Sequence, residues 1–296
     1  MKTIQISKEN LISPSNALTM CLGYFDGVHL GHRQIIHKAV REGDYDLGVL
    51  TFDVPVSSLL ENNKSKEVLT SLTDRFRVID RLGIDYYFIL HIDKDFLNMD
   101  AIEFIELLKK LNVKEIYVGE DYRFGKDRKG DINLLKKHFD VEVIKLLRYD
   151  GKKISSQEII ALLKEGKLEK SNALLGQNYS ISGTVVEGRH NGEKLGIRTA
   201  NVKPSINYVL PRFGVYKVIA YIEGVPHLAI ANVGVHPTIV KEEEPLIEVH
   251  IPGYQNEDYG KAIMVEFLEF IRPEKTFKNK EELVNQVKSD IKKIGL

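Results

Sequence analysis

The first half of the chain alternates short apolar runs with segments whose apolar residues recur at helical spacing. The runs that predict buried strands cover residues 17–22, 47–52, 86–90, 115–118 and 141–147. After the first run, Ile35, Ile36, Ala39 and Val40 fall on one helical face. Strands that alternate with helices in this way predict an α/β fold, a parallel sheet with helices on both faces.

Capping residues predict where several helices begin and end. Thr73 can cap a helix that stops at Gly83, and Asp100 with Glu103 has the spacing of a capping box before an apolar stripe. Residues 53–67 are polar and irregular, so we expect a loop there. Ligands of such parallel sheets bind beyond the carboxyl ends of the strands, so we expect the functional site near these ends.

The second half changes to short strands separated by turns. Runs with strand character cover residues 179–186, 214–222, 227–233, 247–250 and 262–270. Turn signals such as Glu223-Gly224 and Pro252-Gly253 separate them. The pattern predicts a small antiparallel β-barrel, followed by a terminal helix over residues 281–291.

The change of pattern predicts two domains. A short helical segment over residues 168–175 is followed by the turn-forming string Gly176-Gln177-Asn178. We therefore expect an N-terminal α/β domain of residues 1–177 and a C-terminal β-barrel domain of residues 178–296.

Composition argues against several classes of partner. The 296 residues include 42 basic and 42 acidic side chains, so the formal net charge is zero. This balance argues against nucleic acid or an anionic membrane as a partner. No apolar run is long enough to span a bilayer, residues 1–15 lack the apolar segment of a signal peptide, and Cys21 is the single cysteine. These features predict a cytoplasmic protein that acts on small molecules, as a monomer or a weak homo-oligomer.

The stretch CLGYFDGVHLGH, residues 21–32, carries the strongest candidate chemistry. It leads from a predicted strand through a glycine turn into a helix, whose first N–H groups lack partners within the helix and favour anions. His29 and His32 are three positions apart, so both imidazoles can lie on one side of the first turn and donate hydrogen bonds to phosphate oxygens. The alternative is a pair of histidines that only caps the helix.

Two later stretches in the first half also carry polar chemistry. Residues 118–131 hold three glycines, four cationic side chains and the aromatic residues Tyr122 and Phe124. Such a stretch can stack a ring on a ligand and bind phosphates, or it can be a solvated charged loop. In residues 154–166, Ser155 and Glu158 have capping-box spacing, which by itself explains the serine.

Thr199 and Asn201 are the candidate metal ligands of the second half. In an extended segment, residues two apart lie on one face, so a hydroxyl and an amide oxygen would point the same way. Two such oxygens, completed by ATP phosphates and water, suit Mg²⁺. The alternative is a turn that these two side chains cap. The chain contains no P-loop sequence, which excludes a kinase of the P-loop class.

Taken together, the motifs resemble the prokaryotic bifunctional riboflavin kinase/FAD synthetase family over nearly the whole chain. The H-x-G-H string of residues 29–32 is the signature of nucleotidylyltransferases, and GYFDGVHLGH is similar to their FAD synthetase branch. In the second half the strings TANV, FGVY, ANVG, EVH and DYG follow in the order seen in bacterial riboflavin kinases. The resemblance implies an enzyme that phosphorylates riboflavin to FMN and adenylylates FMN to FAD, using ATP and Mg²⁺.

The same resemblance implies roles for individual residues. Its expected catalytic residues are His29 and His32 in the adenylyl transfer and Glu248 as the base of the kinase, and Thr199 with Asn201 would hold Mg²⁺. Its expected flavin contacts are Asp121 and Phe124. Its expected nucleotide contacts are Gly23, Phe25, Asp26, Gly31, Ser155, Ser156 and Lys194.

The chain departs from the family pattern at several positions, which leaves other functions open. Ile160 stands where the family has an arginine, Glu193 where it has another arginine, and Arg198 where it has a proline. A degenerate paralogue that keeps one activity, or a flavin-binding regulatory protein, is therefore an alternative. A nucleotidylyltransferase for another substrate is a third possibility, which the kinase-like strings of the second half disfavour.

Overall fold

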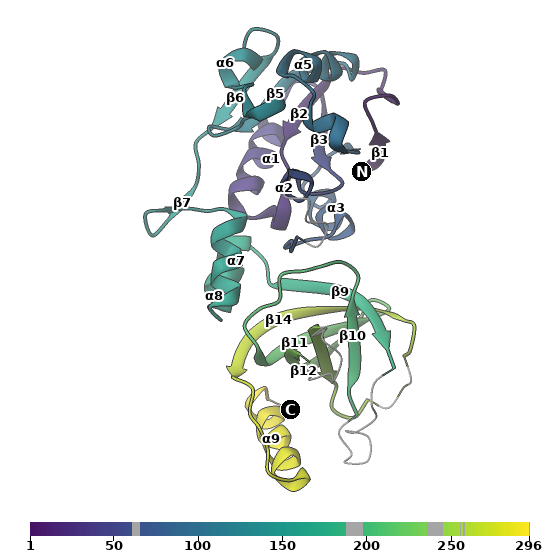
Figure 1. Cartoon of the computed structure of the whole chain (residues 1–296), viewed down its shortest axis with the longest axis vertical. Coiled ribbons are helices and arrows are strands. Elements are labelled where there is room, and N and C mark those ends of the chain that lie inside the picture. Colours follow the sequence, from purple (N-terminus) through teal and green to yellow (C-terminus); the bar gives the residue numbers. More distant parts are fainter. Residues whose placement is uncertain (61–65, 188–197, 236–244, 255, 257, 296) are drawn as a thin grey trace. The chain divides into compact units, whose positions relative to one another are not determined.

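The computed structural model describes residues 1–60, 66–187, 198–235, 245–254, 256 and 258–295. Within it the chain forms two compact units, Met1–Ser156 and Gln157–Leu296, each of which has its own sheet (Figure 1). None of the helices in the described part of the chain has the length and apolar character needed to cross a membrane.

The first unit contains a six-stranded parallel sheet with the strand order β1-β4-β3-β2-β5-β6. Its strands are β1 (Lys2–Ile6), β2 (Leu18–Leu22), β3 (Asp46–Phe52), β4 (Tyr86–Leu90), β5 (Val113–Gly119) and β6 (Asp140–Ile144). After β2 the chain first continues to β3 on one side and later returns to β5 on the other. The carboxyl end of β2 is therefore a topological switch point, where ligands bind in sheets of this kind.

Two hydrophobic clusters show that helices cover both faces of this sheet. The helices are α1 (Leu30–Glu42), α2 (Val56–Leu60), α3 (Leu72–Asp80), α4 (Lys94–Leu97), α5 (Ala101–Lys110) and α6 (Ile132–Leu135), together with the 3₁₀ turns η1 (Asp26–Val28) and η2 (Lys126–Arg128). One cluster joins α1 and α3 to Cys21 of β2, and the other joins α5 to Leu18 and Met20 of the same strand. Because successive strand residues face opposite sides and all five residues of β2 are buried, the strand is covered on both faces. The predicted α/β fold is confirmed.

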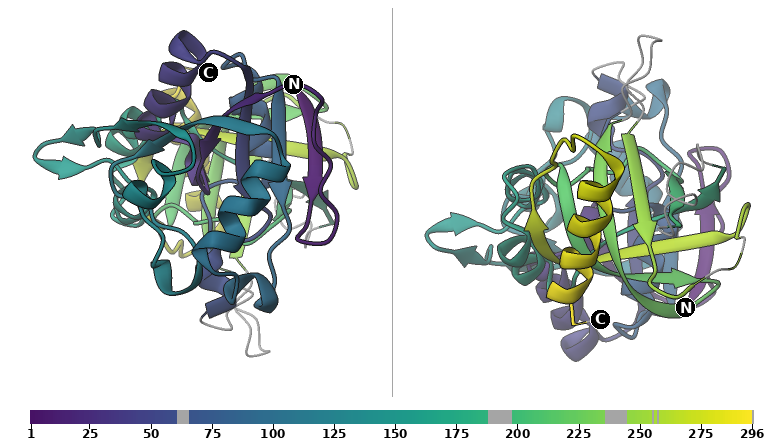
Figure 2. Two further views of the ribbon diagram at one scale, coloured as in Figure 1. Left: turned by 90° about the horizontal axis from the view of Figure 1, so that it is seen from above. Right: turned by 90° about the horizontal axis from the view of Figure 1, so that it is seen from below.

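Several local predictions in this unit are wrong. Helix α3 begins after Ser71, whose side chain accepts a hydrogen bond from the N–H of Asp74 in a capping box, so Thr73 is not the cap. The predicted loop of residues 53–67 includes helix α2. Val40 of α1 is 39% exposed and lies outside the buried stripe of its helix. An unpredicted hairpin of β7 (Arg148–Tyr149) and β8 (Lys152–Lys153) projects from the unit (Figure 2).

The second unit contains a closed antiparallel barrel with the strand order β10-β13-β12-β11-β14-β9. Its strands are β9 (Tyr179–Val186), β10 (Ala200–Pro204), β11 (Gly214–Ile222), β12 (Val225–Val235), β13 (Pro245–His250) and β14 (Ala262–Arg272), and its helices are α7 (Ser156–Lys164), α8 (Leu168–Leu175) and α9 (Lys280–Lys293). Asn172 of α8 donates to the carbonyl of Phe267 and accepts from the N–H of Tyr179, so α8 is bonded to strands β14 and β9. The predicted antiparallel barrel is confirmed.

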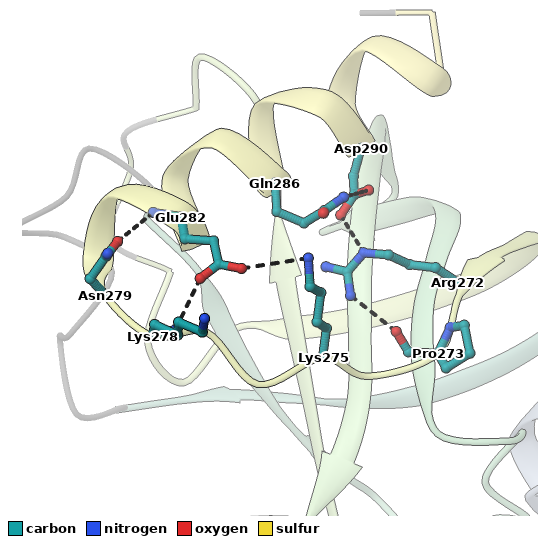
Figure 3. A network of polar contacts seen from close by, with 8 residues as sticks. All are labelled: Arg272, Pro273, Lys275, Lys278, Asn279, Glu282, Gln286 and Asp290. Atoms are coloured by element: carbon teal, nitrogen blue, oxygen red, sulfur yellow. Dashed lines mark hydrogen bonds and ion pairs between the residues drawn. The ribbon is translucent and has the colours of Figure 1, made fainter.

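Helix α9 lies across the barrel and is anchored there by a buried ion pair (Figures 2 and 3). Arg272, the last residue of β14, donates from Nε to Oδ2 of Asp290 at 2.8 Å, and Gln286 donates to the other carboxylate oxygen at 2.9 Å. Asp290 is completely buried, so its charge depends on these two partners. Val287 and Ile291 pack against the barrel on the same face of the helix.

Candidate functional site

The chain leaves β2 through a left-handed turn before it enters α1. Phe25, Gly27 and Val28 have φ angles of 56°, 77° and 41°. Only glycine adopts such angles readily, and the conformation at each of the two other residues costs about 1–3 kcal/mol. Strain of this size persists only where the surroundings hold it, and it is concentrated at functional sites.

His29 follows this turn and caps helix α1. Its Nδ1 accepts a hydrogen bond from the backbone N–H of His32 at 3.4 Å, so a neutral ring carries its proton on Nε2, where it can be donated to a ligand. The rings of His29 and His32 are stacked, with centroids 3.6 Å apart and planes inclined by 19°. The rings of Phe25 and His32 form a T-shaped contact, with their centroids 5.2 Å apart. The structure therefore brings the two predicted imidazoles together, and His29 caps the helix as well.

Glycine at position 31 leaves room for this arrangement. A Cβ atom there would lie 3.2 Å from both Cε1 and Nδ1 of His29. At Gly23, a Cβ would lie 3.0 Å from the ring of Phe25, which is 1% exposed. Gly23, Gly31 and Phe25 were all predicted as nucleotide contacts. In the structure the two glycines let aromatic rings approach the backbone, and Phe25 packs against His32.

Both imidazoles are held in the neutral state. Burial, and then the charge of Lys153, lower the pKa of His29 to about 4. Burial, His29 and Lys153 lower the pKa of His32 well below its ordinary value. Nδ1 of His32 is buried and has no hydrogen-bond partner among the described residues. A buried polar atom without a partner in a stacked pair is suited to a ligand that supplies the missing hydrogen bond.

Asp26 is buried and bonds to the protein rather than to solvent. Its carboxylate accepts hydrogen bonds from the N–H groups of Leu69 and Thr70 and from the hydroxyl of Thr70. Ser156 donates from its hydroxyl to the backbone carbonyl of Asp26 at 2.9 Å, and Ser155 precedes it, half-buried. The predicted nucleotide contacts Asp26 and Ser156 thus meet through a hydrogen bond between a side chain and the backbone.

Sequence reasoning missed Arg75, which lies 1% exposed beneath the same turn. Its guanidinium donates to the carbonyl of Tyr24 and to the hydroxyl of Thr51, both at 2.7 Å, and lies 4.5 Å from the centre of the Tyr24 ring. It ties the end of β2 to the end of β3. The sequence gives no sign that this arginine is buried, because the residues around it form an ordinary amphipathic helical pattern.

The two predicted flavin contacts are placed differently. The carboxylate of Asp121 forms an ion pair with Lys153, and its side chain is 52% exposed just beyond the end of β5. Phe124 is 6% exposed and packs against Phe104, with ring centroids 5.3 Å apart, and against Tyr122. Asp121 is accessible to a ligand, whereas the Phe124 ring belongs to the core.

In the barrel, strand register brings three polar residues into one row. Asn201 of β10 lies opposite Glu248 of β13, and Glu248 lies opposite Asn232 of β12. The strand neighbours of Glu248, Ile247 and Val249, are buried, and so are Ala231 and Val233 beside Asn232. The row therefore lies on the outer face of the barrel. The predicted base and one predicted metal ligand are therefore direct cross-strand neighbours. Asn232 was not predicted, because its position opposite Glu248 depends on register.

Thr199 lies directly before β10 and lines a small hollow of about 30 Å³ together with Arg198, Tyr254 and Tyr259. The ring of His250 contacts the carbonyl of Arg198 through Nδ1 at 2.7 Å, which fixes the segment before Thr199. In the described part of the chain no three His, Cys, Asp or Glu side chains form a metal cluster. A hydroxyl and an amide oxygen fit Mg²⁺ that takes its other ligands from phosphates and water. Glu193 and Lys194 lie outside the described residues.

Comparisons with known proteins agree on both halves of the chain. The FAD synthetase family matches residues 12–158, and the riboflavin kinase family matches residues 175–295. The bifunctional riboflavin kinase/FMN adenylyltransferase of Bacillus subtilis is 35% identical over 98% of this chain and 96% of its own length. Its namesakes in Listeria monocytogenes and Escherichia coli are each 34% identical and cover 92% and 94% of this chain, and 89% and 92% of their own. The crystal structure of a macrolide-efflux protein from Streptococcus pneumoniae has the same fold, with a TM-score of 0.89, 31% identity and coverage of 99% of this chain and 98% of that one.

Proposed function

The chain belongs to the family of bifunctional riboflavin kinase/FMN adenylyltransferases, an enzyme family with both activities, and from this premise we propose which residues carry out each reaction. The enzyme phosphorylates riboflavin to FMN and adenylylates FMN to FAD, with ATP in both steps. The observation that carries this function is the match of both family domains, in order, along one chain. No observation favours a degenerate paralogue or a regulatory flavin-binding protein.

We assign adenylyl transfer to residues 1–177 and the kinase to residues 178–296. The FAD synthetase match ends at residue 158 and the riboflavin kinase match begins at residue 175, which supports a functional boundary in or directly after the segment that contains α7 and α8.

In adenylyl transfer, a phosphate oxygen of FMN attacks the α-phosphorus of ATP, and pyrophosphate leaves. This displacement needs no protein nucleophile, so the protein contributes by positioning the reactants and stabilising charge. His29 donates from Nε2, and His32 and the N–H groups at the start of α1 contribute further donors to the phosphate oxygens. Ser155, directly before α7, borders the nucleotide, and Asp121, beyond β5, borders the flavin.

In the kinase reaction, Glu248 removes the proton of the riboflavin 5′-hydroxyl as the hydroxyl oxygen attacks the γ-phosphorus of ATP, and ADP leaves. Its cross-strand neighbour Asn201 and the adjacent Thr199 would hold Mg²⁺, which neutralises phosphate charge when it is bound. Lys194 is a further candidate for a phosphate contact. The register of Asn201 with Glu248 supports this assignment, because it places the base and the metal ligand on one face.

We also propose that the enzyme acts in the cytoplasm on small molecules alone, as a monomer or a weak homo-oligomer. The zero net charge and the single buried cysteine support this proposal.

The function is tested by incubating the purified chain with riboflavin, ATP and Mg²⁺ and separating the flavins by liquid chromatography. We expect FMN to form first and FAD to follow at its expense. FMN without FAD, or FAD only from added FMN, would show that one activity is missing. Flavin binding without any product would contradict the proposed function.

A further inference from the structure

We propose that Thr70 is a positioning residue for adenylyl transfer, because its hydroxyl locks the left-handed turn of residues 25–28 that sets the ring of His29. The inference rests on the proposed role of His29 and His32. Thr70 contacts neither imidazole in the structure. It acts through the backbone turn that connects β2 to the two histidines.

The hydroxyl of Thr70 uses both of its hydrogen-bonding capacities within the turn. It accepts a hydrogen bond from the N–H of Gly27 at 2.8 Å and donates to Oδ1 of Asp26 at 2.9 Å. The N–H of Thr70 donates to the same Asp26 oxygen at 2.9 Å, and the N–H of Leu69 donates to the carboxylate at 3.0 Å. Thr70 is 8% exposed, so water cannot easily replace these bonds.

The turn needs such support because its backbone is strained. Phe25 and Val28 adopt positive φ angles, which are unfavourable for an aromatic and even more so for a β-branched residue. The N–H of Gly27 lies between them, at the centre of the turn, and Thr70 is the acceptor of that group. Removing the hydroxyl leaves a buried N–H and a buried carboxylate oxygen each short of one partner.

Helix α3 holds the turn at a second point. Arg75, five residues after Thr70, donates to the carbonyl of Tyr24 at 2.7 Å, directly before the first strained residue. The segment of residues 69–75 therefore forms hydrogen bonds with Tyr24, Asp26 and Gly27 of the turn. His29 follows immediately, so relaxation of the turn moves its ring relative to His32. A displacement of about 1 Å at a catalytic group can lower a rate by roughly a hundredfold.

The test compares Thr70→Val, which keeps the shape of the side chain but removes the hydroxyl, with Thr70→Ser, which keeps the hydroxyl. Thr73→Val makes the same change at an exposed position of the adjacent helix and serves as the matched control. Each variant is assayed for FAD formation from supplied FMN and for FMN formation from riboflavin. For Thr70→Val we expect kcat of FAD formation to fall by about tenfold or more, with KM for ATP changed by less than about threefold. Thr70→Ser and Thr73→Val should retain kcat, and the kinase rate should be unchanged in all three.

Three results would overturn the inference. In the first, Thr70→Val retains the kcat of the unsubstituted enzyme. In the second, Thr70→Ser, which keeps the hydroxyl, loses kcat of FAD formation by about tenfold or more, a result that decides the matter even if the valine variant does not fold. In the third, the loss appears in KM alone. Failure of the proposed function is distinguishable, because the unsubstituted enzyme would then make no FAD, or substitution of His29 and His32 would leave FAD formation intact.

Discussion

The imidazole rings of His29 and His32 lie face to face, with their centroids 3.6 Å apart, at the first turn of the helix that follows the central strand. At this distance a proton on one ring disfavours a proton on the other, and burial disfavours both. In the role proposed for it, the pair therefore provides neutral hydrogen-bond donors and not two cations. Positive charge at the site comes from the helix start and from Lys153, which is near enough to lower the pKa of both rings.

The lowered pKa of His29 predicts how stability depends on pH. Between its ordinary value of 6.5 and about 4, the unfolded chain binds a proton at His29 that the folded chain does not. The free energy of unfolding therefore falls as the pH falls through this window, by at most about 3 kcal/mol from this residue. Urea unfolding at pH 7.5 and pH 4.5 measures the change. His29→Asn should lose less stability on acidification than the unsubstituted chain, and equal losses in the two would contradict the pKa assignment.

Gly31→Ala should lower the rate of FAD formation without lowering the stability of the protein. Alanine is favoured over glycine within a helix by up to about 1 kcal/mol, so the melting temperature should stay the same or rise. The new Cβ would lie 3.2 Å from two atoms of the His29 ring, which must shift away from its position over the helix start. We expect FAD formation to fall severalfold while FMN formation by the same preparation is unchanged. A fully active, stabilised variant would show that the ring position is unimportant.

Asn201→Ala should weaken the use of Mg²⁺ by the kinase. The side chain lies opposite Glu248 and is 7% exposed, and its loss removes one proposed Mg²⁺ ligand. The Mg²⁺ concentration that gives half the maximal rate of FMN formation should rise by about tenfold or more. The Mg²⁺ dependence of FAD formation from supplied FMN is the internal control and should not move. An unaltered Mg²⁺ requirement in the kinase assay would exclude Asn201 as a ligand.

The Arg272–Asp290 pair predicts a stability effect that is independent of catalysis. Asp290 is fully buried, and Asp290→Asn leaves the guanidinium of Arg272, with 16% of its side chain exposed, without a charged partner (Figure 3). Loss of one member of a buried pair lowers the free energy of unfolding by about 3–5 kcal/mol. Glu282, on the same helix as Asp290, forms a more exposed 3.6 Å contact with Lys275, which precedes the helix, and Glu282→Gln should cost less than about 1 kcal/mol. Thermal unfolding followed by circular dichroism compares the two, and similar melting temperatures would contradict the anchoring role.

Elements with strong local signals could be predicted from the sequence. The bounds of β4, α8, β9 and β11 agree with the predicted runs, because turn or capping residues flank each of them. Strand β1 was not predicted, since only Ile4 and Ile6 of its five residues are buried and it lies at the sheet edge. The cap of α3 was assigned to Thr73 instead of Ser71, because both residue types cap helices and the choice depends on how residues 69 and 70 are held.

In the candidate site too, local contacts could be predicted from the sequence and long-range contacts could not. The proximity of His29 and His32 follows from their spacing on one helix and was predicted. The contacts of Thr70 with Gly27, and of Arg75 with Tyr24, join residues 43 and 51 positions apart. No local pattern marks such partners. The burial of the Phe124 ring was also missed, since an aromatic residue in a charged loop looks the same whether it faces a ligand or the core.

The most direct test of the two-site account is a crossed assay of two variants. The double variant His29→Ala, His32→Ala should form FMN from riboflavin at the normal rate, while FAD formation from supplied FMN falls by about a hundredfold or more. Glu248→Gln should show the opposite pattern, with FMN formation lost and FAD formation from supplied FMN retained. If the histidine variant still made FAD at the normal rate, or if either variant lost both activities while remaining folded, the assignment of the two reactions to these separate sites would be contradicted.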